Sequence, residues 1–388
     1  MYGVVGGGIA GLVAAARLRE AGHAVRVFEP SGAVGGRART HATAGDPIER
    51  TPHYFVDDAA SSLAAVTDFA DRVAWKRGRT ARYLDGTVHP VDAPWERLAY
   101  PGTGLADGVR LAAFERRIRA RLAGLDGDAS GADEFSEATV EEFVRDRATR
   151  GVYEGYVEPA LRARFGDRAG DVSAAWLGAW LRSRETRGRN GVRAGYLTGS
   201  MDGLVDALVA TIGTDAIRTE TRAVELDRAA APGDPGSRES VSVTVAGPDG
   251  RRTREVDGVV LATAPETLET LTGLETGVET VAASSVLVAA DDPLTDAWRV
   301  TAADDAPFDR VVEHTNLCSP ERYGGAHLWY VVDHAGSTAD AADRDRLLDG
   351  LDACFASFSH DSVRWVRAAR DSAAAVVAPA GDAVPVSL

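Results

Sequence analysis

Residues 1–29 read MYGVVGGGIAGLVAAARLREAGHAVRVFE, and this stretch decides the fold. A short apolar run leads into the glycine-rich segment 6–11, and residues 12–21 are rich in Ala, Leu and Arg, which favour a helix. Residues 24–28 form a second apolar run, and Glu29 stands at its end. Strand, tight turn, helix and strand in this order, within about thirty residues, are typical of a dinucleotide-binding βαβ unit.

The spacing of Gly6, Gly8 and Gly11 gives each glycine its own role in holding a pyrophosphate. Gly6 allows the tight turn, Gly8 leaves no side chain between its backbone and the phosphates, and Gly11 lets the helix pack closely on the strand. Ile9 and Ala10 complete the turn that leads into the helix, whose positive dipole end faces the anion. These residues therefore predict a site for the ADP half of a dinucleotide.

Glu29 indicates which dinucleotide fits. A carboxylate at this place accepts hydrogen bonds from ribose hydroxyls and repels a 2′-phosphate, which argues against NADP. A bare G-x-G-x-x-G arises easily in a chain with 41 glycines, so a glycine-rich surface turn is the alternative interpretation. The strand before the turn, the helix after it and the acid at the end of the second strand favour the nucleotide site.

A second glycine turn follows directly in residues 32–40, GAVGGRART. This arrangement resembles the flavin amine oxidase superfamily, which includes monoamine oxidases, protoporphyrinogen oxidases and phytoene desaturases. The resemblance implies that FAD is the cofactor and that Gly35, Gly36 and Arg37, with Thr40 nearby, wrap the far side of its pyrophosphate. Glycines admit backbone N–H groups close to anionic oxygens, and arginine offers a rigid fork of donors.

The resemblance also implies an α/β fold with a Rossmann-like FAD-binding domain, built from a parallel sheet and a β-meander, and a discontinuous α+β substrate domain. We expect the FAD-binding domain in residues 1–60 and 195–270, the substrate domain in residues 61–194 and 271–375, and a truncated final flavin segment or a tail in residues 376–388. The family pattern places Val224 against the adenine, and Ala262 and Thr263 close to the cofactor.

Local patterns predict further elements. Thr139 and Glu142 form a capping-box pattern that opens a helix, and Asp85-Gly86 is a hairpin turn. We expect helices over residues 62–72, 105–122, 140–147, 174–187, 204–212 and 341–358, and strands over residues 216–227, 240–246, 251–256, 257–265, 284–290, 310–315 and 326–333. The strand over 257–265 reads as a buried parallel strand because it is almost entirely apolar.

Two features depart from the family pattern. Gly381-Asp382 would begin the family's last flavin segment, but the helix that normally follows is absent from the sequence. A naturally short chain, a partner chain that completes the site and a truncated gene all stay open. Amine-oxidising relatives often hold a lysine near flavin N5, late in the substrate domain, whereas Lys76 is the only lysine and lies too early. Desaturase-like and porphyrinogen-oxidase-like substrates therefore stay open as well.

The resemblance implies an FAD-dependent oxidoreductase that transfers a hydride from a C–H bond of a small organic molecule to flavin N5, and a lipophilic substrate stays open. A quinone or dioxygen would be the electron acceptor. His53 and Tyr54 fall where the family has a segment near the isoalloxazine ring, which makes them the catalytic candidates, and a purely structural histidine is the alternative. A flavin-dependent isomerase resembling UDP-galactopyranose mutase, using the basic residues 182–193, and a non-catalytic nucleotide-binding relative are the alternative functions.

Composition excludes several classes of protein. With 43 basic and 58 acidic residues the net charge is -15, which disfavours a nucleic-acid partner. The acidic, lysine-poor composition suits a halophilic cytoplasm, and arginine-biased codon use is the alternative explanation. Cys318 and Cys354 match no metal-ligand spacing, so no metal is expected. We expect no signal peptide and no transmembrane segment, whereas a peripheral membrane contact stays open.

Overall fold

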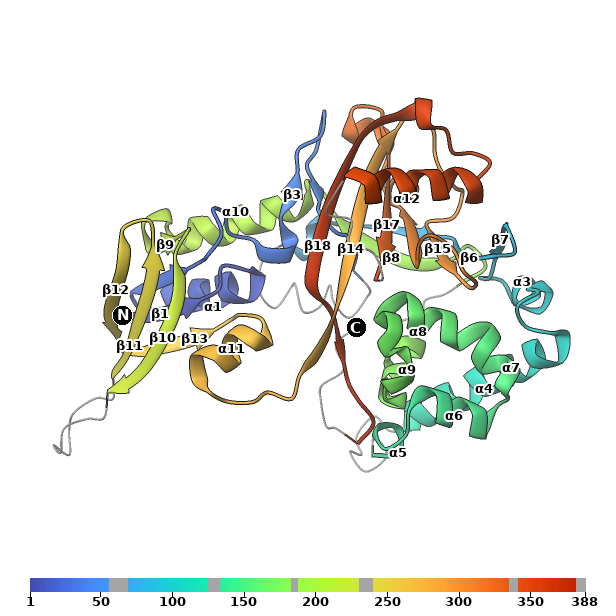
Figure 1. Ribbon diagram of the computed structural model, residues 1–388, viewed down its shortest axis with the longest axis horizontal. Coiled ribbons are helices and arrows are strands. Elements are labelled where there is room, and N and C mark those ends of the chain that lie inside the picture. Colours follow the sequence, from blue (N-terminus) through green and yellow to red (C-terminus); the bar gives the residue numbers. More distant parts are fainter. Residues whose placement is uncertain (56–68, 125–132, 183–187, 230–239, 335–340, 382–388) are drawn as a thin grey trace. The chain divides into compact units, whose positions relative to one another are not determined.

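The computed structural model of the chain describes residues 1–55, 69–124, 133–182, 188–229, 240–334 and 341–381 (Figure 1). The chain divides into two compact units, each assembled from segments that are far apart in sequence. Unit 1 comprises Met1–His53, Ser62–Arg72 and Leu197–Gly277, and unit 2 comprises Tyr54–Ser61, Val73–Tyr196 and Val278–Leu388.

Unit 1 contains a four-stranded parallel sheet in the order β13-β1-β2-β9 and a three-stranded antiparallel meander in the order β10-β11-β12. Its elements are β1 (Tyr2–Val5), α1 (Ile9–Glu20), β2 (Val25–Phe28), η1 (Gly36–Ala38), β3 (Thr40–His41), β4 (Ile48–Glu49), η2 (Ala70–Arg72), α10 (Ser200–Ile212), η6 (Thr214–Ala216), β9 (Ile217–Arg218), β10 (Arg222–Ala229), β11 (Ser240–Gly247), β12 (Gly250–Val256), β13 (Gly258–Leu261) and α11 (Pro265–Thr272).

The parallel sheet of unit 1 lies between two other layers. Helix α1 packs on β1 and β2 and against α10, which forms one covering layer. On the other face, Val5 and Phe28 share a core with Val243 and Val256 of the meander and with Leu271 of α11. Apolar residues point to both faces of β1 and β2 because both faces are covered. This architecture confirms the α/β fold with a parallel sheet and a meander.

Unit 2 combines a helical region with a seven-stranded sheet in the order β18-β14-β17-β16-β15-β6-β7. Its elements are β5 (Val73–Gly78), β6 (Thr80–Leu84), β7 (Thr87–Pro90), α3 (Pro94–Ala99), α4 (Leu105–Gly124), α5 (Asp133–Ser136), α6 (Val140–Arg147), α7 (Arg150–Val152), the π-helical turn η4 (Tyr153–Val157), α8 (Glu158–Phe165), η5 (Gly166–Asp171), α9 (Ala174–Arg182), β14 (Glu279–Ala290), β15 (Arg299–Ala302), β16 (Arg310–Glu313), η7 (His314–Asn316), η8 (Pro320–Tyr323), β17 (His327–Asp333), α12 (Ala341–Cys354), η9 (His360–Ser362) and β18 (Val363–Val377). Strand β8 (Val192–Leu197) also belongs to unit 2, except for its last residue, which is assigned to unit 1.

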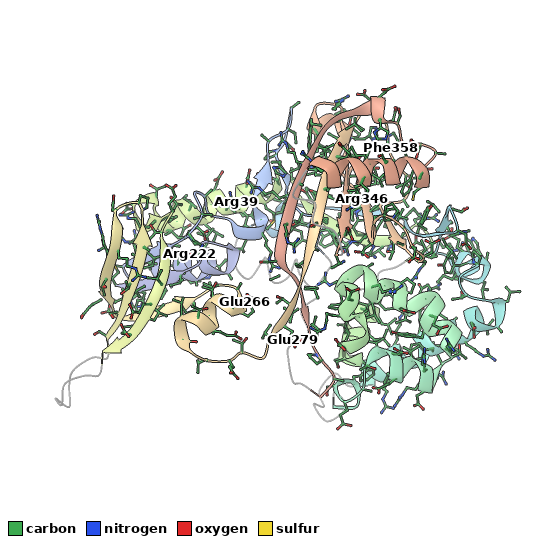
Figure 2. The ribbon with its side chains drawn as sticks, viewed as in Figure 1. Arg39, Arg222, Glu266, Glu279, Arg346 and Phe358 are labelled. Carbon is green, nitrogen blue, oxygen red and sulfur yellow. The ribbon has the colours of Figure 1, made fainter. Side chains whose placement is uncertain are left out.

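The described residues of unit 2 include a hydrophobic core in the helical region and another beneath the sheet. The helical region encloses Phe114, Phe143, Tyr156 and other buried side chains of α4 to α9. The sheet packs Val288, Val300 and their neighbours against α12, the helix whose Arg346 is labelled in Figure 2. Alternate residues of each strand therefore face this second core, and the residues between them face the opposite side of the sheet.

Several predicted elements match the structure. The hairpin turns at Asp85 and Gly86, which both have positive φ, as a type I′ turn requires. The capping box is present, because Thr139 Oγ1 accepts from the Glu142 N–H at 3.2 Å while the Glu142 carboxylate accepts from the Thr139 N–H at 3.0 Å. The predicted helix over 174–187 is present as α9, and its Trp176 and Leu177 are buried in the helical core.

The strand predicted over residues 216–227 is wrong, because two strands occupy this stretch. β9 joins the parallel sheet, and β10 begins the meander. Between them Glu220 adopts a φ of 50°, and its N–H donates to the Ser31 carbonyl while the N–H of Thr221 donates to the Glu29 carbonyl. These long-range hydrogen bonds redirect the chain, and nothing in the apolar pattern of the segment encodes them.

Other boundaries also differ from the predictions. The strand over 257–265 is shorter and only partly buried, since β13 lies at the edge of its sheet. The helix over 341–358 ends at Cys354, after which Phe355 and Phe358 turn into the core beneath α12. The helix over 204–212 begins earlier, at Ser200. Most of the predicted helix 62–72, and residues 183–187 of the predicted helix 174–187, lie outside the described residues.

Among the described residues, none of the helices combines the length and the apolar character that crossing a bilayer requires. In the same part of the chain, no group of three or more His, Cys, Asp or Glu side chains is arranged to hold a metal ion.

Candidate functional site

The first glycine turn of unit 1 is packed so tightly that two of its glycines have no room for a side chain. Gly6 has a φ of 105°, and a Cβ there would lie 2.2 Å from the carbonyl oxygen of Ala262. A Cβ on Gly11 would lie 1.9 Å from the carbonyl oxygen of Gly6. β1, the turn and α1 can therefore approach one another, and the strand end at Ala262, only because both residues are glycine.

Gly8 differs from these two, because the space in front of it is open. A Cβ on Gly8 would have only the Gly36 Cα near it, at 4.0 Å. Gly36 has a φ of 55°, and the N–H of its neighbour Gly35 donates to the Gly7 carbonyl at 2.8 Å. The two glycine turns thus lie side by side and form a surface of bare backbone, which we call the glycine cradle and define by Gly6–Gly8, Gly11 and Gly35–Gly36.

The amino end of α1 opens onto the glycine cradle. The cap residue Gly8 has no side chain to accept from the first turn of the helix, and that turn contains no acidic residue. The first N–H groups of a helix have no partner within the helix, and the helix dipole makes this end attractive to anions. Backbone donors and the positive helix end therefore converge on one side-chain-free surface, which is what a pyrophosphate requires.

Glu29 borders the glycine cradle at the end of β2 and is 9% exposed. Its Oε2 accepts from the Gly7 N–H at 2.7 Å, and its Oε1 accepts from the Ser31 N–H at 3.0 Å and from the Ser31 hydroxyl at 2.7 Å. A Cβ on Gly7 would lie 3.0 Å from Oε2, so glycine is also needed here for this contact. The carboxylate is held in place by these three donors, and its Oε2 keeps a lone pair that can accept from a ribose hydroxyl.

Ser31 and Asp202 take part in this region, although no sequence pattern assigned them. Ser31 follows Glu29 by two residues, a spacing at which serine commonly closes a small turn, and that was the available signal. Thr40, a predicted cofactor residue, donates from its hydroxyl to Asp202 Oδ2 of α10 at 2.6 Å. The Thr40 hydroxyl thus ties the second glycine turn to α10.

The remaining predicted cofactor residues lie on neighbouring segments. Ala262 continues the edge strand next to Gly6, and the buried hydroxyl of Thr263 has no hydrogen-bond partner among the described residues. Val224 occupies a bulge in β10, where the register with β11 shifts between Ala223 and Glu225. Arg37 is exposed on η1.

Glu49 is fully buried on β4, where a carboxylate is costly to bury without partners. Its Oε1 accepts from the Met201 N–H, in the first turn of α10, at 2.7 Å. α10 opens with two residues of positive φ, Gly199 and Ser200, and has no side-chain cap. Glu49 therefore places an acceptor at a helix start, which stabilises the entry of the chain into α10.

The catalytic candidates His53 and Tyr54 fall on different units, His53 on unit 1 and Tyr54 on unit 2. The His53 Nδ1 lies 2.8 Å from the carbonyl oxygen of Thr51, a geometry in which the ring nitrogen donates. The Tyr54 hydroxyl accepts from Arg299 Nη1 at 3.2 Å. Burial raises the pKa of Tyr54, but the positive charges of Arg299, Arg310 and Arg164 outweigh it and lower the net pKa.

A family model described as "Flavin containing amine oxidoreductase" matches residues 9–311, which is most of the chain. The chain belongs to this family. The family binds a flavin, and the cofactor is FAD. The glycine cradle fits it, since a Cβ on Gly8 would enter the space that a pyrophosphate needs and Glu29 is set to accept from the adenosine ribose. The predicted superfamily is confirmed.

Similar proteins of known sequence match only part of the chain. "Putative flavin-containing monoamine oxidase AofH" of Mycobacterium tuberculosis (strain CDC 1551 / Oshkosh) is 30% identical over 183 residues, which cover 46% of this chain and 40% of that protein. "Coproporphyrinogen III oxidase" of Mycobacterium bovis (strain ATCC BAA-935 / AF2122/97) is 29% identical over 182 residues, which cover 44% of this chain and 38% of the relative. Each match spans less than half of the relative's length.

Solved structures agree on the fold over nearly the whole chain. A "Putative protoporphyrinogen oxidase" from Exiguobacterium sp. 255-15 superimposes with a TM-score of 0.73 at 15% identity, covering 98% of this chain and 88% of that one. At this identity the likeness shows the α/β fold of the family and nothing of the substrate.

Proposed function

We propose that the protein is an FAD-dependent oxidoreductase that removes a hydride from a C–H bond of a small organic substrate. Bound FAD would supply the hydride acceptor at its N5 atom. A quinone or dioxygen would serve as the final electron acceptor. The observation that carries this proposal is the open backbone surface at Gly8, packed beside Gly36 and bordered by the fixed carboxylate of Glu29.

The chain's own residues would bind and orient the cofactor. The first-turn N–H groups of α1, next to the open space at Gly8, would hold the pyrophosphate, with Arg37 adding charge from the second turn. Glu29 would fix the adenosine ribose, Val224 would contact the adenine, and Ala262 and Thr263 would let the cofactor approach the edge strand closely. Unit 1 would thus be the FAD-binding unit, and unit 2 the substrate-binding unit.

His53 and Tyr54 remain our candidates for positions next to the substrate. The His53 Nδ1 is occupied by the Thr51 carbonyl, which leaves its Nε2 as the ring atom that could carry a proton. The Tyr54 hydroxyl, whose pKa is lowered by neighbouring arginines, can both accept and donate a hydrogen bond. Hydride transfer to a flavin needs no obligatory proton carrier, so we assign both residues to positioning.

The test begins with the cofactor. We expect the purified full-length chain, in concentrated salt, to retain one FAD per chain and to show the flavin absorbance bands, which bleach when a substrate is added without oxygen. A chain that takes up no FAD on reconstitution would refute the proposal. FAD that stays bound and oxidised while the substrate is rearranged would point to an isomerase instead.

Glu29→Gln sharpens this test. The amide would turn its donor group toward either the Gly7 N–H or the Ser31 groups, which are themselves donors. We expect FAD to bind about tenfold more weakly or worse, in line with the loss of a hydrogen bond to a charged group. Glu20→Gln is the matched control, because Glu20 is an exposed acid of α1 paired only with Arg17 at 2.8 Å.

A further inference from the structure

The seven-stranded sheet of unit 2 has two chemically different faces. Val300 of β15 and Val311 of β16 belong to the core beneath α12. Side chains alternate along a strand, so the residues on either side of these valines face the opposite way. Arg299 pairs with Val312 and Thr301 pairs with Arg310, a register that puts Arg299 and Arg310 on the same face, away from α12.

Helix α8 brings a third arginine to this face. α8 packs against β15, and Arg164, near its end, acts electrostatically on both Tyr54 and Arg310. The Tyr54 hydroxyl accepts from Arg299 Nη1, and its ring packs edge-on against Trp298, with the ring centroids 4.9 Å apart. We call Tyr54, Arg164, Arg299 and Arg310 the arginine face.

Arg299 and Arg310 of the arginine face differ from most arginines of unit 2 in their partners. Among the described residues, neither Arg299 nor Arg310 forms an ion pair, and the Nε of Arg310 is buried without a hydrogen-bond partner. The charge of Asp309 favours the protonated form of Arg310, but the Asp309 carboxylate makes its hydrogen bonds with His334, whose Nδ1 and N–H lie 2.8 Å and 2.6 Å from Asp309 Oδ2.

Other arginines of unit 2 form ion pairs with carboxylates. Arg79 contacts both Asp92 and Glu96, at 3.2 Å and 2.6 Å, and Arg97 contacts Glu115 at 3.2 Å. Burial, together with the charges of Arg164 and Arg299, lowers the pKa of Arg310 to about 10. Since like charges were brought together here in a chain of net charge -15, the arrangement needs a compensating anion.

We propose that the arginine face binds an anionic oxygen group of the substrate, a carboxylate or a phosphate, between Arg299 and Arg310. Guanidinium groups bind such groups through two parallel N–H donors, and the Tyr54 hydroxyl is free to turn and donate a further bond. The same charges repel a protonated amine, so the substrate is acidic rather than basic. This inference rests on the proposed function, because it describes what the oxidoreductase acts on.

The test measures anion binding directly, with the full-length FAD-loaded protein. Calorimetric titrations with benzoate, inorganic phosphate, neutral benzamide and cationic benzylamine compare carboxylate, phosphate, uncharged and positive probes. We expect saturable binding of benzoate or phosphate, which also identifies the favoured anion, and no saturable binding of benzamide or benzylamine. Binding of neither anion, or equal binding of benzylamine, would overturn the inference.

Variants assign the binding to these side chains. We expect Arg299→Gln and Arg310→Gln to weaken anion binding about tenfold or more, since each removes a charge-assisted pair of hydrogen bonds, and Arg310→Lys to lose less because it keeps the charge. Arg364→Gln is the control, because this exposed arginine of β18 pairs with Asp291 at 2.6 Å. If both glutamine variants bind the anion as the native protein does, the inference is wrong.

Two further readouts separate the possible failures. Each glutamine variant removes an uncompensated positive charge, so we expect its thermal unfolding temperature to be no lower than that of the native protein. We also expect the added anion to raise the unfolding temperature of the native protein but not that of the variants. The flavin spectrum is recorded in the same samples. FAD reduction by a substrate without any anion binding would overturn the inference and leave the proposed function standing, whereas anion binding in a chain that takes up no FAD would refute the proposed function.

Discussion

The glycine cradle of unit 1 and the arginine face of unit 2 both suit anions, but they use opposite means. The cradle is a glycine surface at which the amino end of α1 offers backbone N–H groups, whereas the arginine face collects charged side chains around a tyrosine. Backbone donors are rigid and carry no net charge, so they need a close fit. Guanidinium groups act at longer range and need a counter-charge. The comparison predicts different responses to substitution in the two regions.

The largest effect is expected at Gly8. The space in front of Gly8 is open in the protein, so Gly8→Val should fold normally and yet fill the volume that the pyrophosphate needs. We expect FAD affinity to fall by about 100-fold or more, measured by flavin retention and titration. Gly170→Val is the control, since a Cβ at this glycine of unit 2 meets nothing within 4 Å. Normal FAD retention in Gly8→Val would show that the cradle is not the nucleotide site.

At Gly11, in contrast to Gly8, we expect a substitution to lower the stability of the fold itself. A Cβ there would lie 1.9 Å from the Gly6 carbonyl oxygen, so the fold itself must shift. We expect Gly11→Ala to lower the free energy of unfolding by about 3 kcal/mol, the upper part of the range for an overpacked site. Urea unfolding of the apoprotein measures this. An unchanged midpoint would mean that α1 can move away from β1 without cost.

Buried titratable groups should make unit 2 sensitive to pH, whereas the backbone donors of the cradle do not titrate. Glu313 is fully buried, and burial raises its pKa from 4.5 to about 7, against hydrogen bonds from Thr315 and Leu294. Between pH 4.5 and about 7 the unfolded chain loses this proton while the folded chain keeps it, so stability falls as the pH rises.

Glu313→Gln should remove that loss. The difference in unfolding free energy between Glu313→Gln and the native protein should rise by about 2 kcal/mol between pH 5 and pH 7. The neighbouring His314 has the opposite influence, because burial lowers its pKa from 6.5 to about 3, so its contribution to stability rises with pH over that window. Comparison with Glu321→Gln, an exposed acid on η8, cancels general charge effects. A difference that stays constant across this range would contradict the assignment.

The smallest effect is expected at a site that serves neither region. Thr139→Ala removes one half of the capping box of α6 and should cost unit 2 about 1 kcal/mol. Anion binding at the arginine face and FAD binding should both stay unchanged. Chemical denaturation together with the two binding assays checks this. If anion binding fell as well, it would respond to any loss of stability in unit 2. The arginine variants could then no longer assign anion binding to their side chains.

The success of the sequence-based predictions depended on how local the determining contacts are. The turn at Gly6, the helix after it and Glu29 lie within one short stretch, and their spacing alone predicts β1, α1 and β2. Thr139 and Glu142 likewise cap their helix with contacts only three residues apart. The break between β9 and β10 could not be predicted, since it depends on carbonyls of Glu29 and Ser31 almost two hundred residues away.

The amino-acid sequence by itself determined the glycine cradle, because a glycine's role in a turn follows from backbone conformation over a few residues. Only the tertiary structure decided the arginine face. Tyr54, Arg164, Arg299 and Arg310 belong to no common motif, and they meet because strand register sends two of them to one side of a sheet and α8 packs over it. Register and packing depend on the whole chain, so no short stretch encodes which charges become neighbours.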